Sequence, residues 1–183
     1  MTITQDGFDI LRKKFGKLSQ SQVDGINFLV SVLDEDKVII PTQVAYILAT
    51  AWHETAKIMQ PVIEYGSEKY LKSKQYYPYI GYGYVQLTWL ANYKRMGDYL
   101  KIDLVKNPKL ALQADIAARV MIIGMKKGMF TGKKLADYIN QDRKDYINAR
   151  RIINGTDKAE LIAGYAEIFE AILQASEVTI LSY

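Results

Sequence analysis

Residues 43–56 read QVAYILATAWHETA, an apolar run that ends in the only histidine of the chain and a glutamate. Val44, Ile47, Leu48 and Ala51 recur at intervals of three and four residues, which is the spacing of one face of an α-helix. The pattern predicts a helix that buries this face and carries an acid near its carboxyl end.

Glu54 follows Ile47, Thr50 and Ala51 at helical spacing, so it shares their face if the helix continues that far. Apolar surroundings and the negative end of the helix dipole both favour the protonated form of a carboxyl group, the form that a general acid needs. Alternatively, the helix has already ended and Glu54 only hydrates its terminus. His53 either supports this acid or is a satisfied core imidazole.

The composition restricts the chemistry that the chain can perform. With 183 residues and 49% hydrophobic content, the chain can bury a full core, and we expect one domain over residues 1–183. It has no cysteine and one histidine, which excludes disulfides, thiolate nucleophiles, Cys-ligated zinc and sites with several histidines. Carboxylate chemistry remains, and we expect neither a metal nor a cofactor.

Periodicity and turn residues predict a mostly helical fold around this segment. Ser19 and Gln22 form a capping-box pattern at the start of an early helix. We expect a loop over 57–80 with one short helix near 67–73, and a period-2 extended segment over 81–89. Further helices are expected at 90–100, 112–123, 134–150 and 157–175.

Tyrosines and acids gather between the two predicted elements 43–56 and 81–89. Seven of the fourteen tyrosines lie between positions 65 and 84, where their rings can stack on sugars or simply fill space. Glu64 and Glu68 lie in the same stretch. Either of them, together with Glu54, would give the pair of carboxyl groups that glycosidases place on both sides of the cleaved bond.

Charge is unevenly distributed along the chain. Residues 119–151 hold nine Lys and Arg against three Asp, although the net charge of the whole chain is only +4. Such a region can bind nucleic acid, a membrane surface or an anionic polymer such as cell wall, and it can equally be a solvated helical face. Nothing except charge favours nucleic acid, so we do not expect it as a partner.

Four ordered segments together resemble the chitinase-like glycoside hydrolases of family 19. They are AYILATAWHETA (45–56), IGYGYVQLTWLANY (80–93), IDLVKNPKLAL (102–112) and ARRIINGTDK (149–158). The resemblance covers about residues 20–172 and is closest to the bacteriophage endolysins of the group, which degrade peptidoglycan. It implies a lysozyme-like, mainly α fold with two lobes around a cleft and a short extended segment at that cleft.

The resemblance also implies an inverting mechanism with named residues. Glu54 matches the general acid, Glu64 the general base, and Thr88 the hydroxyl that holds the attacking water. Glu68 remains an alternative base, because the loop between the two acids is short. His53 is expected to support the acid.

The sugar-contacting residues follow from the same resemblance. Tyr82 stands where the family usually has Arg between two glycines, so a charge near the catalytic pair is missing or comes from elsewhere. Thr156 replaces a glycine of the family's Asn-Gly-Gly segment. The positions that match sugar contacts are Gln86, Asn92, Tyr93, Arg151 and Asn154.

These expectations combine into a peptidoglycan-cleaving endolysin that is a monomer and contacts anionic wall or membrane surfaces through residues 119–151. The opening MTITQDGFDI has no basic segment followed by an apolar one. We therefore expect synthesis in the host cytoplasm and action in the periplasm or cell wall after release through a pore-forming partner. The alternatives are a chitinase acting on N-acetylglucosamine polymers and a noncatalytic wall-binding virion protein.

Overall fold

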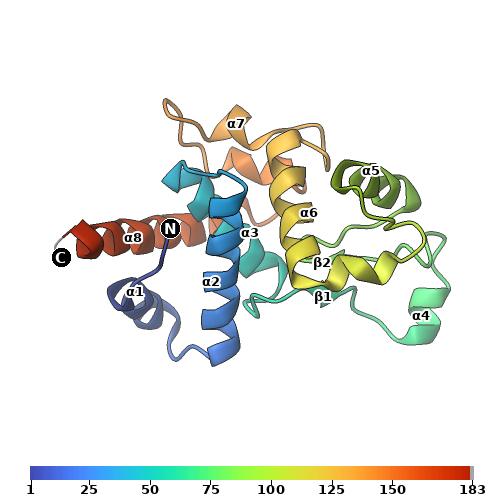
Figure 1. The fold of residues 1–183 in the computed structure, drawn as a ribbon, viewed down its shortest axis with the longest axis horizontal. Coiled ribbons are helices and arrows are strands. Elements are labelled where there is room, and N and C mark those ends of the chain that lie inside the picture. The colour runs from blue at the N-terminus through green and yellow to red at the C-terminus, as the bar shows by residue number, and fades with distance from the viewer. Residues whose placement is uncertain (182–183) are drawn as a thin grey trace.

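The structure, a computed structural model, is mainly helical as the sequence predicts (Figure 1). It describes the backbone of residues 1–181 and the side chains of residues 1–177. The elements in chain order are α1 (Gln5–Phe15), α2 (Gln20–Glu35), α3 (Pro41–Glu54), β1 (Val62–Ile63), α4 (Glu68–Lys72), β2 (Tyr82–Gly83), α5 (Leu90–Leu100), the 3₁₀ helix η1 (Pro108–Leu112), α6 (Ala114–Lys127), α7 (Leu135–Tyr138), the 3₁₀ helix η2 (Asn148–Ile152) and α8 (Ala159–Leu181).

Helix α3 is the central helix of the first lobe. It starts with Pro41 in its first turn, where a missing N–H costs nothing, and it reaches Glu54 as predicted. Every residue from Val44 to Trp52 is buried, so the helix is enclosed on all sides and not only along the predicted stripe. Its main neighbour is α8, against which α1 also packs.

The predicted helix starts of α2 and α4 are confirmed by their caps. The Ser19 hydroxyl accepts from the Gln22 backbone N–H at 3.2 Å, while the Gln22 side chain accepts from the Ser19 N–H at 2.8 Å. In α4 the Ser67 hydroxyl accepts from the N–H of Tyr70 at 3.2 Å. These bonds satisfy donors that have no partner inside the helix.

Helix α1 was not predicted, because its glycine lowers the helix propensity of a short amphipathic segment. The same glycine is what allows α1 to approach α8. A Cβ at Gly7 would lie 2.7 Å from Ser176 Oγ, and that hydroxyl also accepts from the Thr4 N–H at 3.1 Å. Phe8 and Leu11 are buried on this side of α1, so tertiary packing stabilises the helix.

Two hydrophobic cores define the two lobes, and α6 belongs to both. Helices α1, α2, α3 and α8 surround the larger core, whereas α5, η1 and β2 surround the smaller one. On α6, Ala118 and Met121 pack into the larger core, and Ile116 and Val120 into the smaller. In Figure 1 this helix accordingly stands between the two parts of the molecule. Across residues 1–181 no helix is both long and apolar enough to cross a membrane.

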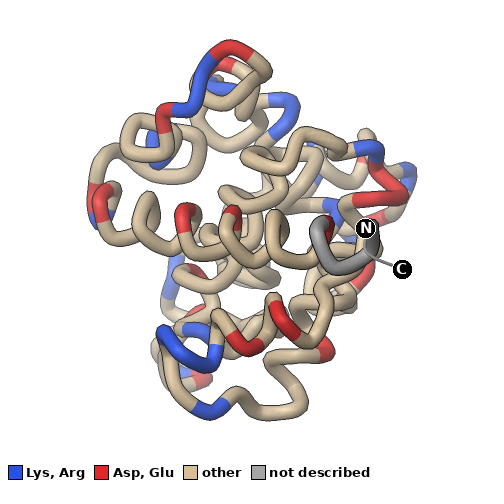
Figure 2. The backbone as a smooth tube through the Cα atoms, turned by 90° about the vertical axis from the view of Figure 1, so that its left-hand side faces the viewer, with Lys and Arg blue, Asp and Glu red and all other residues tan. Residues whose placement is uncertain are grey.

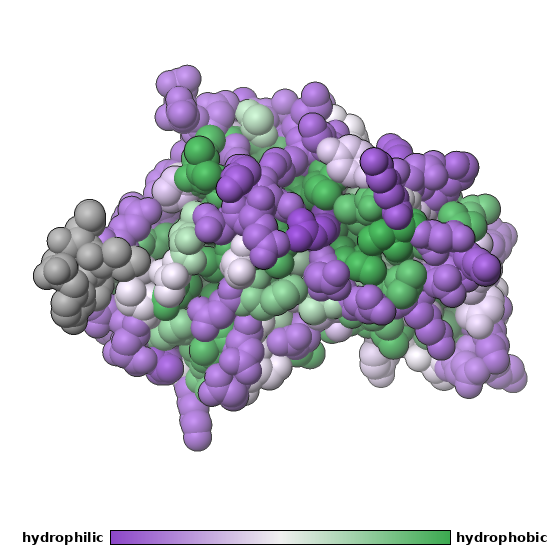
Figure 3. Space-filling model, in the orientation of Figure 1, coloured by the Kyte–Doolittle hydropathy of each residue, from purple (hydrophilic) through white to green (hydrophobic). Residues whose placement is uncertain are grey.

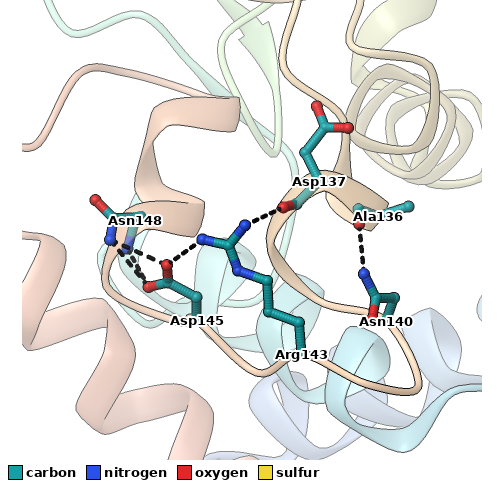
Figure 4. Close-up of polar contacts among 6 residues, drawn as sticks. All are labelled: Ala136, Asp137, Asn140, Arg143, Asp145 and Asn148. Atoms are coloured by element: carbon teal, nitrogen blue, oxygen red, sulfur yellow. Dashed lines mark hydrogen bonds and ion pairs between the residues drawn. The ribbon is translucent and has the colours of Figure 1, made fainter.

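The predicted helix over 134–150 is wrong, since it contains only α7, a polar loop and the start of η2. Arg143 organises the loop by donating to the Asp137 carbonyl at 2.9 Å and to the Asp145 carboxylate at 2.8 Å (Figure 4). The amide of Asn148 donates in turn to Asp145 at 3.0 Å. Asn and Asp side chains that bond nearby backbone favour turns over helices, and this preference dominates here.

The extended segment expected over 81–89 is mostly a tight hairpin. Only Tyr82–Gly83 forms a strand, which pairs with Val62–Ile63 in antiparallel fashion. The chain then reverses, so that Tyr82 bridges Leu87, and Gly83 and Gln86 adopt positive φ angles of 99° and 53°. This turn buries Tyr84, which the period-2 pattern had placed with the polar face.

Candidate active site

Glu54 ends α3 in direct contact with a buried arginine. Its Oε1 accepts from the guanidinium of Arg150, which lies in η2 and is 3% exposed. Arg150 Nε also donates to the Asp157 carbonyl at 2.9 Å. The sequence led us to expect apolar surroundings for this acid, and the structure places a buried guanidinium beside it.

Two further side chains of α3 lie near this ion pair. His53 is half-buried, and desolvation lowers its pKa below 6.5, an effect that Glu54 opposes and Arg150 reinforces. Tyr46 is fully buried, and burial raises the pKa of its hydroxyl. At neutral pH both groups are therefore uncharged.

Glu64 directly follows β1 and is fixed by two donors. Its Oε1 accepts from the Tyr76 hydroxyl at 2.7 Å and its Oε2 from the Gly81 N–H at 2.9 Å. The Glu64 N–H donates to the Gly81 carbonyl at 2.7 Å, so backbone and side chain are held by the same residue. Carboxylates bonded in this way have a fixed orientation, which a general base needs in order to activate water.

Tyr76 is itself supported by the exposed ring of Trp89. The two ring centroids are 4.9 Å apart, and the ring planes are tilted by 57°. The Trp89 N–H donates to the Tyr79 carbonyl at 2.9 Å, which fixes the residue after Thr88 to the loop that carries Tyr76. Trp89, Tyr76 and Glu64 thus form a chain of contacts that the sequence did not reveal.

The carboxylate of Glu64 faces a pocket of about 510 Å³ in the second lobe. Tyr65, Tyr77 and Tyr82 contribute aromatic rings to its wall, and Lys109 contributes an ammonium group. Figure 3 shows apolar surface among hydrophilic atoms over this half of the molecule. A volume and a lining of this kind suit a sugar ring, whose faces pack on aromatic side chains.

Residues 55–63 connect the two acids and cross from the first lobe to the second. The Thr55 hydroxyl is buried, donating to the Ala51 carbonyl at 2.7 Å and accepting from the Met59 N–H at 3.0 Å. A Cβ at Gly25 would lie 2.1 Å from the Met59 carbonyl oxygen, so α2 allows this close approach only because the position is glycine. The link between the lobes is therefore anchored to the first lobe.

Glu68, the alternative base, lies in the first turn of α4. Its side chain is 81% exposed and forms an ion pair with Lys72 at 2.6 Å. Hydrogen bonding to Lys72 lowers the pKa of Glu68. Glu68 reaches the rim of the same pocket, but unlike Glu64 it is held only by a solvent-exposed partner.

Gln86 and Thr88 lie in the turn before α5, and Asn92 in the first turn of α5 is hydrogen-bonded to Thr88. The Thr88 hydroxyl donates to the Gln86 carbonyl at 2.8 Å, and the Thr88 carbonyl accepts from the Asn92 amide at 2.8 Å. The Gln86 amide donates at 3.2 Å to the carbonyl of Val62, which lies two residues before Glu64 in the sequence. All three predicted residues are half-buried, and the Thr88 oxygen can still accept from a water.

Tyr93 lies deeper than Tyr82 and does not reach the surface. Tyr93 is 0% exposed and its hydroxyl donates to the Ile80 carbonyl at 2.8 Å, which contradicts the expected direct contact with sugar. The ring of Tyr93 packs against the ring of Tyr82, with the two centroids 6.5 Å apart. Tyr82 is 6% exposed and lines the pocket with its ring.

Arg151 and Asn154 are both exposed, whereas Arg150 makes the contact with the acid. The carbonyl of Arg151 accepts from the Thr131 hydroxyl at 2.7 Å, and the Asn154 N–H donates to the Arg150 carbonyl at 3.0 Å. The sequence has two adjacent arginines at this point, and the family resemblance assigned the sugar contact to the second, Arg151. Only the turn of η2 decides which of them points inward.

The basic region 119–151 is partly neutralised, since three of its nine Lys and Arg side chains pair with acids from elsewhere in the chain. Arg119 pairs with Glu35 and Asp36, at 2.8 and 2.7 Å, and Lys144 pairs with Glu170 at 3.1 Å. Figure 2 accordingly shows Lys and Arg segments interspersed with Asp and Glu segments. The basic residues of this region with an intramolecular partner are Arg119, Lys126, Arg143, Lys144 and Arg150.

The described residues contain no group of three or more His, Cys, Asp or Glu that could hold a metal ion. The site contains two carboxyl groups in different lobes, each with its own hydrogen-bond partners.

Comparison of the structure with solved structures gives strong matches to family 19 chitinases. A bacterial family 19 chitinase superimposes with a TM-score of 0.66 at 22% identity, covering 94% of this chain and 95% of that one. Chitinase C from Streptomyces griseus HUT6037 gives 0.54 at 21% identity, covering 94% and 70%, and a Glu-to-Gln mutant of chitinase C gives 0.59 at 20%, covering 94% and 76%. No protein-family model and no curated protein sequence matches the chain. The chain thus has the fold of these chitinases.

Proposed function

We propose that this protein is a glycoside hydrolase that cleaves the glycan strand of peptidoglycan by an inverting mechanism, with Glu54 as the general acid and Glu64 as the general base. The observation that carries the proposal is the placement of two oriented glutamates in two lobes, one beside Arg150 and the other at a pocket with aromatic walls. The chitinase fold and the four sequence segments support the same reaction class.

Each carboxyl group has an environment that suits its proposed step. Arg150 occupies Oε1 of Glu54 and leaves Oε2 to carry the proton that is donated to the leaving oxygen. The guanidinium then stabilises the carboxylate that remains. Tyr76 and Gly81 orient Glu64 so that its remaining lone pairs accept a proton from water, and Thr88 helps to hold that water.

Digestion of purified peptidoglycan tests the proposal directly. Borohydride reduction followed by mass spectrometry identifies the new reducing end, which is muramic acid for a muramidase and glucosamine for a glucosaminidase. Proton NMR of a β-linked oligosaccharide during hydrolysis should show the α-anomer first, as inversion requires. A β-anomer as the first product would reject inversion, and with it the role of Glu64 as a general base that activates water.

Two alternatives have support of their own. The solved structures with this fold are described as chitinases, which favours chitin as a substrate. Hydrolysis of chitohexaose faster than of peptidoglycan would select that function. A noncatalytic wall-binding virion protein would instead bind purified walls without releasing any fragment.

We place the protein in bacteriophage lysis, where it acts on the wall after release through a pore-forming partner. The resemblance of four segments to phage endolysins supports this role. Expression together with a membrane-permeabilising protein should lyse host cells, whereas expression alone should not. Contact with anionic surfaces would use the exposed remainder of the basic region, so lysis of whole cells should weaken between low and physiological salt.

A further inference from the structure

The pocket beside Glu64 continues into a second pocket of about 400 Å³. The two pockets share Tyr77, Tyr82 and Lys109 in their walls, so they are adjacent. Lys106 and Gln113 complete the polar part of the second wall. A polymer whose backbone passes Glu64 would therefore present its next substituent to this second pocket.

Two lysines give the second pocket its positive charge. Lys106 and Lys109 line it, and no Asp or Glu does, although Lys109 also lines the first pocket together with Glu64 and Glu68. None of the salt bridges among the side chains of residues 1–177 involves Lys106 or Lys109. The nearest acid along the chain is Asp103, whose carboxylate accepts from the backbone N–H of Lys106 at 2.9 Å.

The fold fixes the backbone of Lys109 relative to the aromatic wall. Lys109 lies in η1, and η1 packs directly on β2, which carries Tyr82. A Cβ at Gly83 would lie 3.1 Å from the Ala111 carbonyl, so these two backbones approach as closely as a glycine allows. Lys109 is thus held beside Tyr82 by backbone packing.

We propose that the second pocket binds a carboxylate substituent of the glycan strand, with Lys106 and Lys109 as its cationic partners. This inference rests on the proposed function and names the chemical feature by which the site would select its substrate. A lysine ammonium is a compact charge that pairs with a carboxylate, while Tyr77 and Tyr82 offer ring faces to the adjoining sugar. Muramic acid residues carry such a substituent, whereas chitin is neutral.

The carboxylate has two sources in peptidoglycan. An N-acetylmuramic acid without a peptide has a free lactyl carboxylate, and one with a stem peptide has the carboxylates of that peptide. Three soluble probes separate the cases: the N-acetylglucosamine–N-acetylmuramic acid disaccharide, the same disaccharide bearing a tetrapeptide, and neutral chitobiose.

Binding is measured by titration calorimetry on the Glu54→Gln protein, so that no probe is hydrolysed. In this background Lys106→Gln and Lys109→Gln are combined, and the matched control combines Lys13→Gln and Lys14→Gln, which remove the same charge from exposed positions on α1. The pocket variant should bind the charged probes about tenfold more weakly, as the loss of a charge-assisted bond implies. Chitobiose binding should be unchanged, and the control should match the parent protein with all three probes.

The charged probe with the larger loss identifies the source of the carboxylate. The inference would be overturned if affinity fell equally in the pocket and control variants, or if chitobiose lost as much affinity as the charged probes. It would also be overturned if neither charged probe bound measurably to the parent protein. Activity is a separate readout. If binding depends on the lysines but the wild-type protein hydrolyses nothing, the proposed function is rejected and the subsite is retained. If the protein hydrolyses peptidoglycan but binding does not depend on the lysines, the subsite is rejected and the proposed function is retained.

Discussion

Arg150 and Glu54 are 96 positions apart in the sequence and in direct contact in the fold. The arginine is 3% exposed and reaches the acid from η2, while its Nε is fixed by the Asp157 carbonyl. Helix α3 presents its last residue to this charge. The pair therefore joins the most buried helix of the first lobe to the loop that precedes α8.

Replacement of Glu54 by Gln should reduce turnover by about a thousandfold, which is within the usual contribution of a general acid. The amide keeps an oxygen for Arg150 but has no acidic proton, so thermal unfolding should change little. Release of reducing ends from peptidoglycan measures the loss. Glu167→Gln on the exposed side of α8 is the control and should be fully active. Near-normal turnover in the Glu54 variant would remove this residue from the mechanism.

The two adjacent arginines should respond differently to the same change. Arg150→Met leaves Glu54 partly buried without its counter-charge and should lower the free energy of unfolding by about 3 kcal/mol, with a parallel loss of activity. Arg151→Met removes an exposed side chain and should change stability by no more than about 0.5 kcal/mol. Chemical denaturation checks both values. Equal effects of the two substitutions would contradict the inward orientation of Arg150.

His53 provides a direct probe of the charges around Glu54, because it is the only histidine of the chain. Burial lowers its pKa below 6.5, so the imidazole proton resonances of untagged protein should titrate with a midpoint under that value. Glu54→Gln removes a charge that raises the pKa and should move the midpoint lower. Arg150→Met removes a charge that lowers it and should move the midpoint higher.

The same shift has a consequence for stability. Since the folded-state pKa of His53 lies below its unfolded value of about 6.5, the unfolded chain binds more protons between the two values. The free energy of unfolding should therefore fall as the pH drops through this interval, and His53→Gln should remove that part of the pH dependence. A midpoint above 6.5 in the native protein would place His53 in a different environment.

Tyr76 should act by positioning Glu64, because its hydroxyl donates to Oε1 and its ring packs against Trp89. Tyr76→Phe keeps the ring contact and removes the donor, so kcat should fall roughly tenfold while KM stays nearly constant. Tyr99→Phe, on the exposed face of α5, is the matched control. An increase in KM alone would assign Tyr76 to sugar binding.

The sequence predicted the elements whose signals are local. The apolar run of α3 and the side-chain caps at Ser19 and Ser67 lie within a few residues of the elements that they specify. Helix α1 was missed because it depends on Gly7 fitting against Ser176, a contact between the two ends of the chain.

The candidate site shows the same limit. The two acids could be named from sequence segments, but the groups that fix them could not. Arg150 looks identical to Arg151 in the sequence, and only the turn of η2 separates a buried partner from an exposed one. Tyr93 matched a surface contact by its position, yet the packing of α5 on the hairpin buries it completely. Burial depends on long-range packing that periodicity in one segment does not encode.

The choice between Glu64 and Glu68 is the last and sharpest test of the assignment. Both reach the same pocket, but Glu64 is oriented by a hydroxyl and a backbone N–H, whereas Glu68 is 81% exposed and pairs with Lys72. A base must hold its carboxylate about 6.5–9.5 Å from the acid so that a water fits between base and sugar. Fixed hydrogen bonds can maintain such a distance, and an exposed ion pair on a short helix maintains it poorly.

Glu64→Gln should therefore reduce turnover by orders of magnitude, whereas Glu68→Gln should leave both turnover and stability nearly unchanged. Azide should partly restore turnover to Glu64→Ala, because a small anion can attack without a base, and the product would be a glycosyl azide detectable by mass spectrometry. Azide should have no such effect on Glu68→Ala. If loss and rescue instead follow position 68, the base lies on α4, and the hydrogen bonds of Tyr76 and Gly81 to Glu64 only stabilise the hairpin.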